Sequence, residues 1–301
     1  MRRLITPLAA LLLLGAGCAP TRTGTLGPAP AGSSPTGASP TGTTPGTPAP
    51  GTSPGGRTPS PSADPTGPAT AGTPTPDGTI TVELWFTRDG GLVATRRTRA
   101  ATLATSRLAL TELAAGPSRA ETATGMGTLV PPGTQVSRIV GGVATLVAPT
   151  GFATGDAATA RLRRAQVVWT LTQFPSVRRV AFAGDDGAPT GRDDYADLLP
   201  PIVVTAPAVG DRITSPVTVT GTAEVFEATV SVRVLDAAGR EIGTAFTVAA
   251  CGSGCRGGYR VNVGYRRATA GPGTVEVYEV SARDGSRINV VAVPVVMAAS
   301  G

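Results

Sequence analysis

Two of the three cysteines stand close enough in the sequence to bond to each other. Cys251 and Cys255 are separated by Gly-Ser-Gly, and the glycines let so short a loop close without backbone strain. An even pair in an oxidising compartment predicts a disulfide, worth about 2 kcal/mol at most in the chain-entropy model. The alternatives are a free dithiol or half of a metal site, but the chain has no histidine and no second cysteine pair to complete such a site.

The third cysteine, Cys18, ends an N-terminal stretch with the layout of a secretory signal. Two early arginines precede an apolar run that reaches Leu14, and small residues lead from there to Cys18. The stretch resembles the lipobox of bacterial lipoproteins, except that Gly15 stands where the family usually has leucine. The resemblance implies that residues 1–17 are a cleaved signal peptide and that the Cys18 thiol accepts a diacylglycerol. A plain signal peptide or a membrane-spanning anchor is the alternative, but the apolar run is short for a bilayer.

Histidine and lysine are absent from the whole sequence. Without histidine the chain cannot build a Ser-His-Asp or Cys-His catalytic group, or a zinc or haem site with histidine ligands. Without lysine it cannot build a Ser-Lys nucleophile, a Schiff base or a Walker-type phosphate loop. Carboxylate and arginine chemistry remain. We therefore predict that the protein is not an enzyme and that it has no catalytic residue, no metal site and no cofactor.

The carboxylates offer two patterns that could carry chemistry. Glu224 and Glu227 flank Phe226, and paired carboxylates beside an aromatic ring occur in glycosidases. Their three-residue spacing across a strand end does not set two carboxyls face to face over a cleft. We therefore predict that Phe226 plugs the end of a sandwich and that both glutamates lie in solvent. Asp185–Asp186 and Asp193–Asp194 lack the spacing and the bidentate glutamate of an EF-hand loop, so exposed acidic loops are predicted there.

The charge of the chain is positive and comes entirely from arginine. The 26 basic residues exceed the 20 acidic ones and give a net charge of +6. Removal of the signal leaves 24 basic residues against 20 acidic ones, a net charge of +4. The arginines are scattered along the chain and are not clustered among aromatic residues, so we predict no binding to nucleic acid.

Residues 18–77 are almost wholly Pro, Gly, Thr, Ser and Ala, without apolar periodicity. Such a segment buries too little apolar surface to offset the entropy lost on ordering, so a disordered linker is predicted. Its ends would average about 40 Å apart if fully flexible, and about 180 Å apart in the polyproline conformation. We expect it to act as a spacer that holds the following residues away from the membrane.

Residues 78–187 show the pattern of a small α+β domain, with two helices on one face of a sheet. The predicted strands are 79–86, 92–95, 135–140, 143–147 and 177–182, and the predicted helices are 103–114 and 158–172. Gly141-Gly142 between two strands is a strong hairpin signal. Gly116-Pro117 and Pro175 mark the ends of the helices, because glycine caps a helix and proline cannot continue one.

Three blocks in this region resemble the sporulation and spore germination (GerMN) domain. They are Leu113–Pro117 (LAAGP), Leu129–Thr134 (LVPPGT) and Val168–Val177 (VWTLTQFPSV), the last being the most distinctive. The family is not known as enzymatic, and its fold is similar to the ring-building modules of envelope assembly complexes. The resemblance therefore implies protein–protein contact.

After a short predicted linker at 188–200, residues 201–298 show an all-β pattern. Alternating valines and regularly spaced turns indicate an immunoglobulin-like sandwich of about seven strands. The disulfide and the tryptophan typical of antibody domains are missing. Ser215–Ala228 (SPVTVTGTAEVFEA) resembles the immunoglobulin-like domain of bacterial spore germination proteins, and residues 202–209 and 281–285 support this. In that family the domain commonly follows a GerMN domain.

These features together predict a lipoprotein of the bacterial cell membrane, anchored on its extracytoplasmic face. It would present two non-catalytic interaction domains to envelope proteins or cell-wall components. The alternative is a module that binds cell-wall glycan or another ligand. That function would need an exposed aromatic platform, and Trp85 and Trp169 both lie on predicted elements. A hydrolase would have only carboxylates to use.

Overall fold

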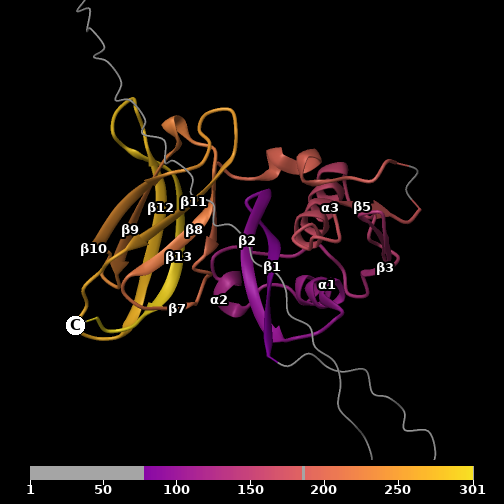
Figure 1. The fold of residues 1–301 in the computed structure, drawn as a ribbon, viewed down its shortest axis with the longest axis horizontal. Coiled ribbons are helices and arrows are strands. Elements are labelled where there is room, and N and C mark those ends of the chain that lie inside the picture. Colours follow the sequence, from indigo (N-terminus) through magenta and orange to yellow (C-terminus); the bar gives the residue numbers. More distant parts are fainter. Residues whose placement is uncertain (1–77, 185–186, 301) are drawn as a thin grey trace, which may run out of the picture. The chain divides into compact units, whose positions relative to one another are not determined.

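The computed structural model describes residues 78–184 and 187–300, shown as a ribbon in Figure 1. The predicted signal peptide 1–17, Cys18 and the predicted linker 18–77 lie outside the described residues. Within them, a mixed α/β domain is followed by an all-β sandwich. This confirms the predicted order of fold classes along the chain.

The first domain is built from two hairpins and three helices. Its strands are β1 (Thr79–Arg88), β2 (Gly91–Ala100), β3 (Gln135–Val140), β4 (Val143–Val147) and β5 (Arg179–Phe182), and its helices are α1 (Thr105–Ala115), α2 (Arg119–Thr122) and α3 (Ala157–Leu171). The strands form two sheets where the sequence predicted one. β1 pairs antiparallel with β2, and β4 lies between an antiparallel β3 and a parallel β5.

The helix ends follow from local chemistry. α1 ends at Gly116, whose φ of 85° lies in the left-handed region that favours glycine. The short helix α2 was not predicted, although its sequence carries a capping box. The Ser118 side chain accepts from the backbone N–H of Glu121, and the Glu121 carboxylate accepts from the backbone N–H of Ser118.

One edge of β1 pairs with β2, and side chains of α3 close the other edge. Gln173, just after α3, accepts from the backbone N–H of Glu83 and donates to its carbonyl oxygen, both at 2.7 Å. Two residues further along β1, the Trp85 N–H donates to Thr170 Oγ1 at 3.1 Å. Alternate residues of a strand present their backbone groups to the same side, so these contacts satisfy the edge that β2 leaves open.

The same edge continues without a gap. Gln166 donates to the carbonyl of Trp85 at 2.9 Å, and its other amide atom accepts from the Leu129 N–H at 2.8 Å. Thr87 then exchanges two backbone hydrogen bonds with Gly127, at 2.8 and 2.9 Å. Thr170 and Gln173 of the block 168–177 therefore seal β1, while Val168, Trp169, Leu171 and Val177 enter the core.

The segment 188–200, predicted to be a linker, contains the 3₁₀ helix η1 (Arg192–Leu198), which contacts α3. Arg161 of α3 forms an ion pair with Asp197 at 2.7 Å, and its guanidinium lies 5.5 Å from the centre of the Tyr195 ring. Tyr195 is buried. An aromatic anchor and an ion pair thus order most of a stretch that composition assigned to a linker.

The second domain is a sandwich of eight strands. They are β6 (Ile202–Ala206), β7 (Arg212–Ile213), β8 (Val217–Ala223), β9 (Thr229–Asp236), β10 (Glu241–Val248), β11 (Gly257–Val263), β12 (Gly271–Val280) and β13 (Arg287–Met297). One sheet has the order β10-β9-β12-β13-β7 and the other has the order β11-β8-β6. Inward-facing valines dominate the core, as the alternation predicted.

Two buried tyrosines join elements of the sandwich. The Tyr259 hydroxyl donates to the carbonyl of Val203 at 3.0 Å, and the Tyr265 hydroxyl donates to that of Ile213 at 3.1 Å. Burial raises the pKa of the Tyr259 hydroxyl above its ordinary value. The ring of Tyr259 lies against Gly221, where a Cβ atom would come within 2.6 Å of the hydroxyl oxygen.

Candidate functional site

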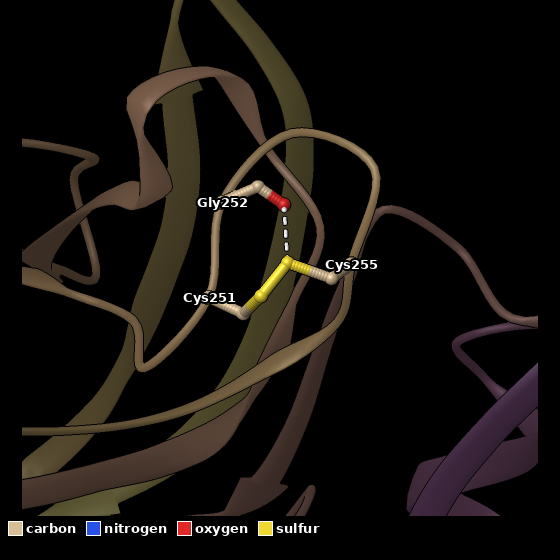
Figure 2. Close-up of a disulfide and its surroundings, with 3 residues drawn as sticks. All are labelled: Cys251, Gly252 and Cys255. Atoms are coloured by element: carbon tan, nitrogen blue, oxygen red, sulfur yellow. Dashed lines mark hydrogen bonds between the residues drawn. A yellow bond between two sulfur atoms is a disulfide. The ribbon is translucent and has the colours of Figure 1, made fainter.

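Cys251 and Cys255 are joined by a disulfide in the loop between β10 and β11 (Figure 2). Their Cα atoms are 5.7 Å apart. The Cys255 N–H donates to the carbonyl of Gly252 at 3.1 Å, and the Cys255 sulfur lies 3.5 Å from the same oxygen (Figure 2). The cross-link closes a turn that backbone hydrogen bonding also closes, so its effect is local.

The disulfide loop is packed tightly against its neighbours. A Cβ atom at Gly257 would come within 2.1 Å of the backbone nitrogen of Cys251, and one at Gly252 would come within 3.2 Å of that of Ala228. Next to the loop, Arg256 donates to the carbonyl of Pro200 at 2.8 Å. Burial lowers the pKa of the Arg256 guanidinium. These contacts give the loop a structural role.

The two glutamates of the glycosidase-like pattern are exposed, as predicted, but Phe226 is not the plug of the sandwich end. The Phe226 side chain is 53% exposed, whereas Val225 beside it is buried. The 3₁₀ turn η2 (Phe226–Ala228) causes the difference, because Glu227 and Ala228 have φ angles of 52° and 57° and turn the chain. The prediction that Phe226 plugs the end of the sandwich was wrong, and the neighbouring Val225 is the buried residue.

A buried carboxylate that the sequence analysis missed supports this turn. Glu279 on β12 accepts from the Phe226 N–H at 2.9 Å and from the Asn289 side-chain amide at 2.7 Å. Asn289 also has a positive φ, 52°. Glu279 thus joins the η2 turn to the start of β13 (Arg287–Met297), and both contacts are structural. Its signal in the sequence was a carboxylate at an inward position, two residues after Val277.

A second buried carboxylate, Glu121, is only 1% exposed. It accepts from Thr95 Oγ1 at 2.5 Å, from the Ser118 N–H at 2.7 Å and from two nitrogens of Arg97. Burial opposes the charge of Glu121, but the hydrogen bonds from Arg97, Thr95 and Ser118 outweigh it and lower the pKa of the carboxyl. The group is ionised and fully engaged in structural contacts.

Neither tryptophan forms an exposed platform. Trp85 and Trp169 are buried, with ring centroids 4.7 Å apart, and the Arg192 guanidinium lies 4.5 Å from the Trp169 ring centre. The Trp85 indole N–H donates to Glu83 at 2.8 Å. The Trp169 indole N–H is the one buried side-chain polar group without a hydrogen-bond partner in the part of the chain that the structure describes. Both residues belong to the core of the first domain.

Among residues 78–184 and 187–300, no group of three or more His, Cys, Asp or Glu side chains is placed to hold a metal ion. In the same ranges no helix has the length and apolar character needed to span a membrane.

Two family models match the chain. The model for "Sporulation and spore germination" matches residues 75–189, and the model for "Immunoglobulin-like domain of bacterial spore germination" matches residues 201–286. These are the two families that the sequence motifs resemble. No curated protein matches the chain.

Solved structures give weaker likenesses. Tandem GerMN domains of the sporulation protein GerM from Bacillus subtilis match at 17% identity with a TM-score of 0.33, over 62% of this chain and 62% of that one. A putative lipoprotein from Clostridium perfringens matches at 17% identity with a TM-score of 0.24, over 42% and 97% of the two chains. CopC from Methylosinus trichosporium OB3b matches at 13% identity with a TM-score of 0.23, over 33% and 96%. Scores this low carry no argument about function.

Proposed function

We propose, from the matches of residues 75–189 and 201–286 to the two spore germination domain families, that this chain is an envelope lipoprotein. In this proposal a lipid on Cys18 anchors the protein to the extracytoplasmic face of the cell membrane. The segment 18–77 is the spacer, and the two domains bind partners in the envelope without catalysis.

The observation that carries the proposal is the succession of these two domains after an N-terminal stretch that resembles a lipoprotein signal at residues 1–17, followed by Cys18. A lipidated cysteine places the following residues outside the cytoplasmic membrane. The lack of catalysis is supported by the chemistry of the described carboxylates. Glu121 and Glu279 are buried and occupied by hydrogen bonds, while Glu224 and Glu227 are exposed.

A glycan-binding function has less support. The aromatic platform that it needs would come most naturally from tryptophan, and Trp85 and Trp169 are both buried. The role in sporulation or germination itself belongs to the families, and we propose for this chain only the anchored, binding role.

The anchor is tested by replacing Cys18 with serine and following the protein through membrane fractionation of a bacterial host. Cys18→Ser removes the thiol that would accept the lipid, so we expect the protein to leave the membrane fraction. A double variant, Cys251→Ser with Cys255→Ser, is the matched control and should remain at the membrane. Retention of Cys18→Ser in the membrane fraction, or a wild-type N-terminal peptide whose mass lacks a lipid, would refute the anchor.

A further inference from the structure

The two sheets of the first domain differ in whether their edge strands have hydrogen-bond partners on the outer side. The open edge of β1 is sealed by Gln173, Thr170, Gln166 and Gly127, as described above. β3 is also an edge strand, in the order β3-β4-β5. Within residues 78–184 and 187–300, the backbone of β3 makes hydrogen bonds only along the ladder that it shares with β4. An edge strand presents about half of its N–H and C=O groups outward, so β3 offers a row of free partners for another strand.

The side chains of β3 are exposed on both faces. Of its six residues, only Val136 is partly buried. Val140 is 68% exposed and Ile139 is 37% exposed, and Val147 on the neighbouring strand β4 is 49% exposed. Apolar side chains on a free edge are what proteins usually avoid, because such an edge pairs with other strands. This edge is therefore suited to a partner.

Three arginines lie on β3 or near the β3–β4 turn, with Arg179 on β5, on the far side of β4 from the free edge. In the strand register Val140 lies opposite Val143, which in turn lies opposite Arg179 of β5. Arg138 shares the face of Val140, two residues earlier on β3. The guanidinium of Arg178 lies over Gly142, in the β3–β4 turn. All three arginines are exposed.

These arginines are anchored but not neutralised by carboxylates of the described residues. Arg178 donates to the carbonyl of Gly141 at 2.9 Å, Arg179 to that of Pro189 at 3.0 Å, and Arg138 to Thr145 Oγ1 at 3.4 Å. Ion pairs in the described residues engage other arginines instead, namely Arg88, Arg96, Arg97, Arg99, Arg161, Arg233 and Arg240. Each guanidinium has five N–H donors, so most of their donors face outward for an anionic ligand.

We propose that the free edge of β3 binds an extended, acidic segment of a partner protein by β-augmentation. The partner strand would pair with the β3 backbone, place small apolar side chains beside Ile139 on one face, and place Asp or Glu side chains beside Arg138 on the other face. Main-chain pairing gives the affinity in this mode, and alternate side chains give the specificity. A purely anionic polymer would use the arginines and leave the backbone edge unpaired. This inference rests on the proposed binding role of the domain and names the chemistry of its partner.

The test uses the full-length protein in detergent and a fluorescein-labelled ten-residue peptide of alternating valine and glutamate. Fluorescence anisotropy gives its dissociation constant. We expect Arg138→Glu to weaken binding about tenfold, since it puts a like charge beside the peptide carboxylates. Arg283→Glu, the same charge reversal at an exposed loop of the second domain, should leave the affinity unchanged. A peptide of alternating valine and lysine should not bind.

Three further measurements separate the proposal from its competitors. A probe N-methylated at every second residue keeps its charge but loses its pairing N–H groups, and we expect it to bind about tenfold more weakly. Equal affinity of that probe, or displacement of the parent peptide by polyphosphate at equal charge, would mean a simple anion site and would overturn the proposal. Failure of the parent peptide to bind would also overturn it. Self-association of the wild type that Arg138→Glu abolishes would assign the edge to a second copy.

Membrane fractionation of Arg138→Glu keeps this test apart from that of the anchor. The variant should stay in the membrane fraction, since Cys18 is untouched. If Cys18→Ser leaves the membrane fraction and the wild type does not bind the peptide, the lipid anchor is supported and the proposal for the β3 edge is refuted. If Cys18→Ser stays in the membrane fraction and still binds the peptide, the lipid anchor is refuted and the proposal for the β3 edge is supported.

Discussion

Gln173 and Glu83 are 90 residues apart in the sequence, and the side-chain amide of the first forms two hydrogen bonds with the backbone of the second, each 2.7 Å long. The amide behaves as one more residue of a neighbouring strand. It gives β1 a partner on the side away from β2 without adding a strand to the sheet. The distinctive block 168–177 is thus explained by the need to seal a strand edge with a helix end.

We expect Gln173→Ala to destabilise the first domain by about 1 to 3 kcal/mol, because it leaves a partly buried N–H and C=O of Glu83 without partners. Urea unfolding followed by tryptophan fluorescence would measure this, since Trp85 and Trp169 lie in that core. Gln135→Ala, at an exposed position of β3, is the control and should change little. Equal stabilities of the two variants would show that the edge of β1 needs no seal.

Much of this fold could be predicted from the sequence, because its elements carry strong local signals. Gly141-Gly142 marks the β3–β4 turn, where both glycines have positive φ angles, and Gly116 ends α1. Alternating valines marked the strands of the second domain. The capping box from Ser118 to Glu121 is a local signal for α2, although no helix was predicted there.

Other features depended on contacts that local patterns do not encode. Phe226 looked like a core residue by type, but its direction follows from the positive φ of Glu227 and Ala228, and alanine gives no hint of that conformation. The segment 192–198 is joined to α3 by Arg161, which lies 36 residues before its partner Asp197. The role of Gln173 was equally out of reach, since its partner is far away in the sequence.

We expect Glu121→Gln to lower the free energy of unfolding at neutral pH by about 2 to 3 kcal/mol, because Arg97 loses its charged partner and an amide cannot accept all the bonds that the carboxylate accepts. The pH dependence should change as well. The folded pKa of Glu121 lies below its ordinary value of 4.5, so the contribution of its charge is complete above that value. It is lost as the pH falls through the lower, folded pKa.

The wild type should therefore lose stability more steeply than Glu121→Gln as the pH falls below 4.5. Urea unfolding at a series of pH values would show the two curves converging in acid. Glu224→Gln, a change at an exposed carboxylate of the second domain, is the control and should leave the curve of the wild type unaltered. Parallel curves for wild type and Glu121→Gln would contradict the assigned charge.

We expect Gly257→Ala to be the more damaging of two glycine substitutions that are chemically the same. At Gly257 a Cβ atom would lie 2.1 Å from the backbone nitrogen of Cys251 and 2.8 Å from that of Ala250, so the disulfide loop would have to move away from β11. Crowding against backbone atoms costs on the order of 1 to 3 kcal/mol or more. At Gly264, just after the same strand, a Cβ atom would meet nothing within 4 Å.

Thermal unfolding should therefore show a clearly lower midpoint for Gly257→Ala and a nearly unchanged one for Gly264→Ala. If reducing the disulfide restored the stability of Gly257→Ala, the strain would lie in the cross-linked loop, whereas a midpoint equal to that of wild type would mean that the loop is not packed on β11 as described.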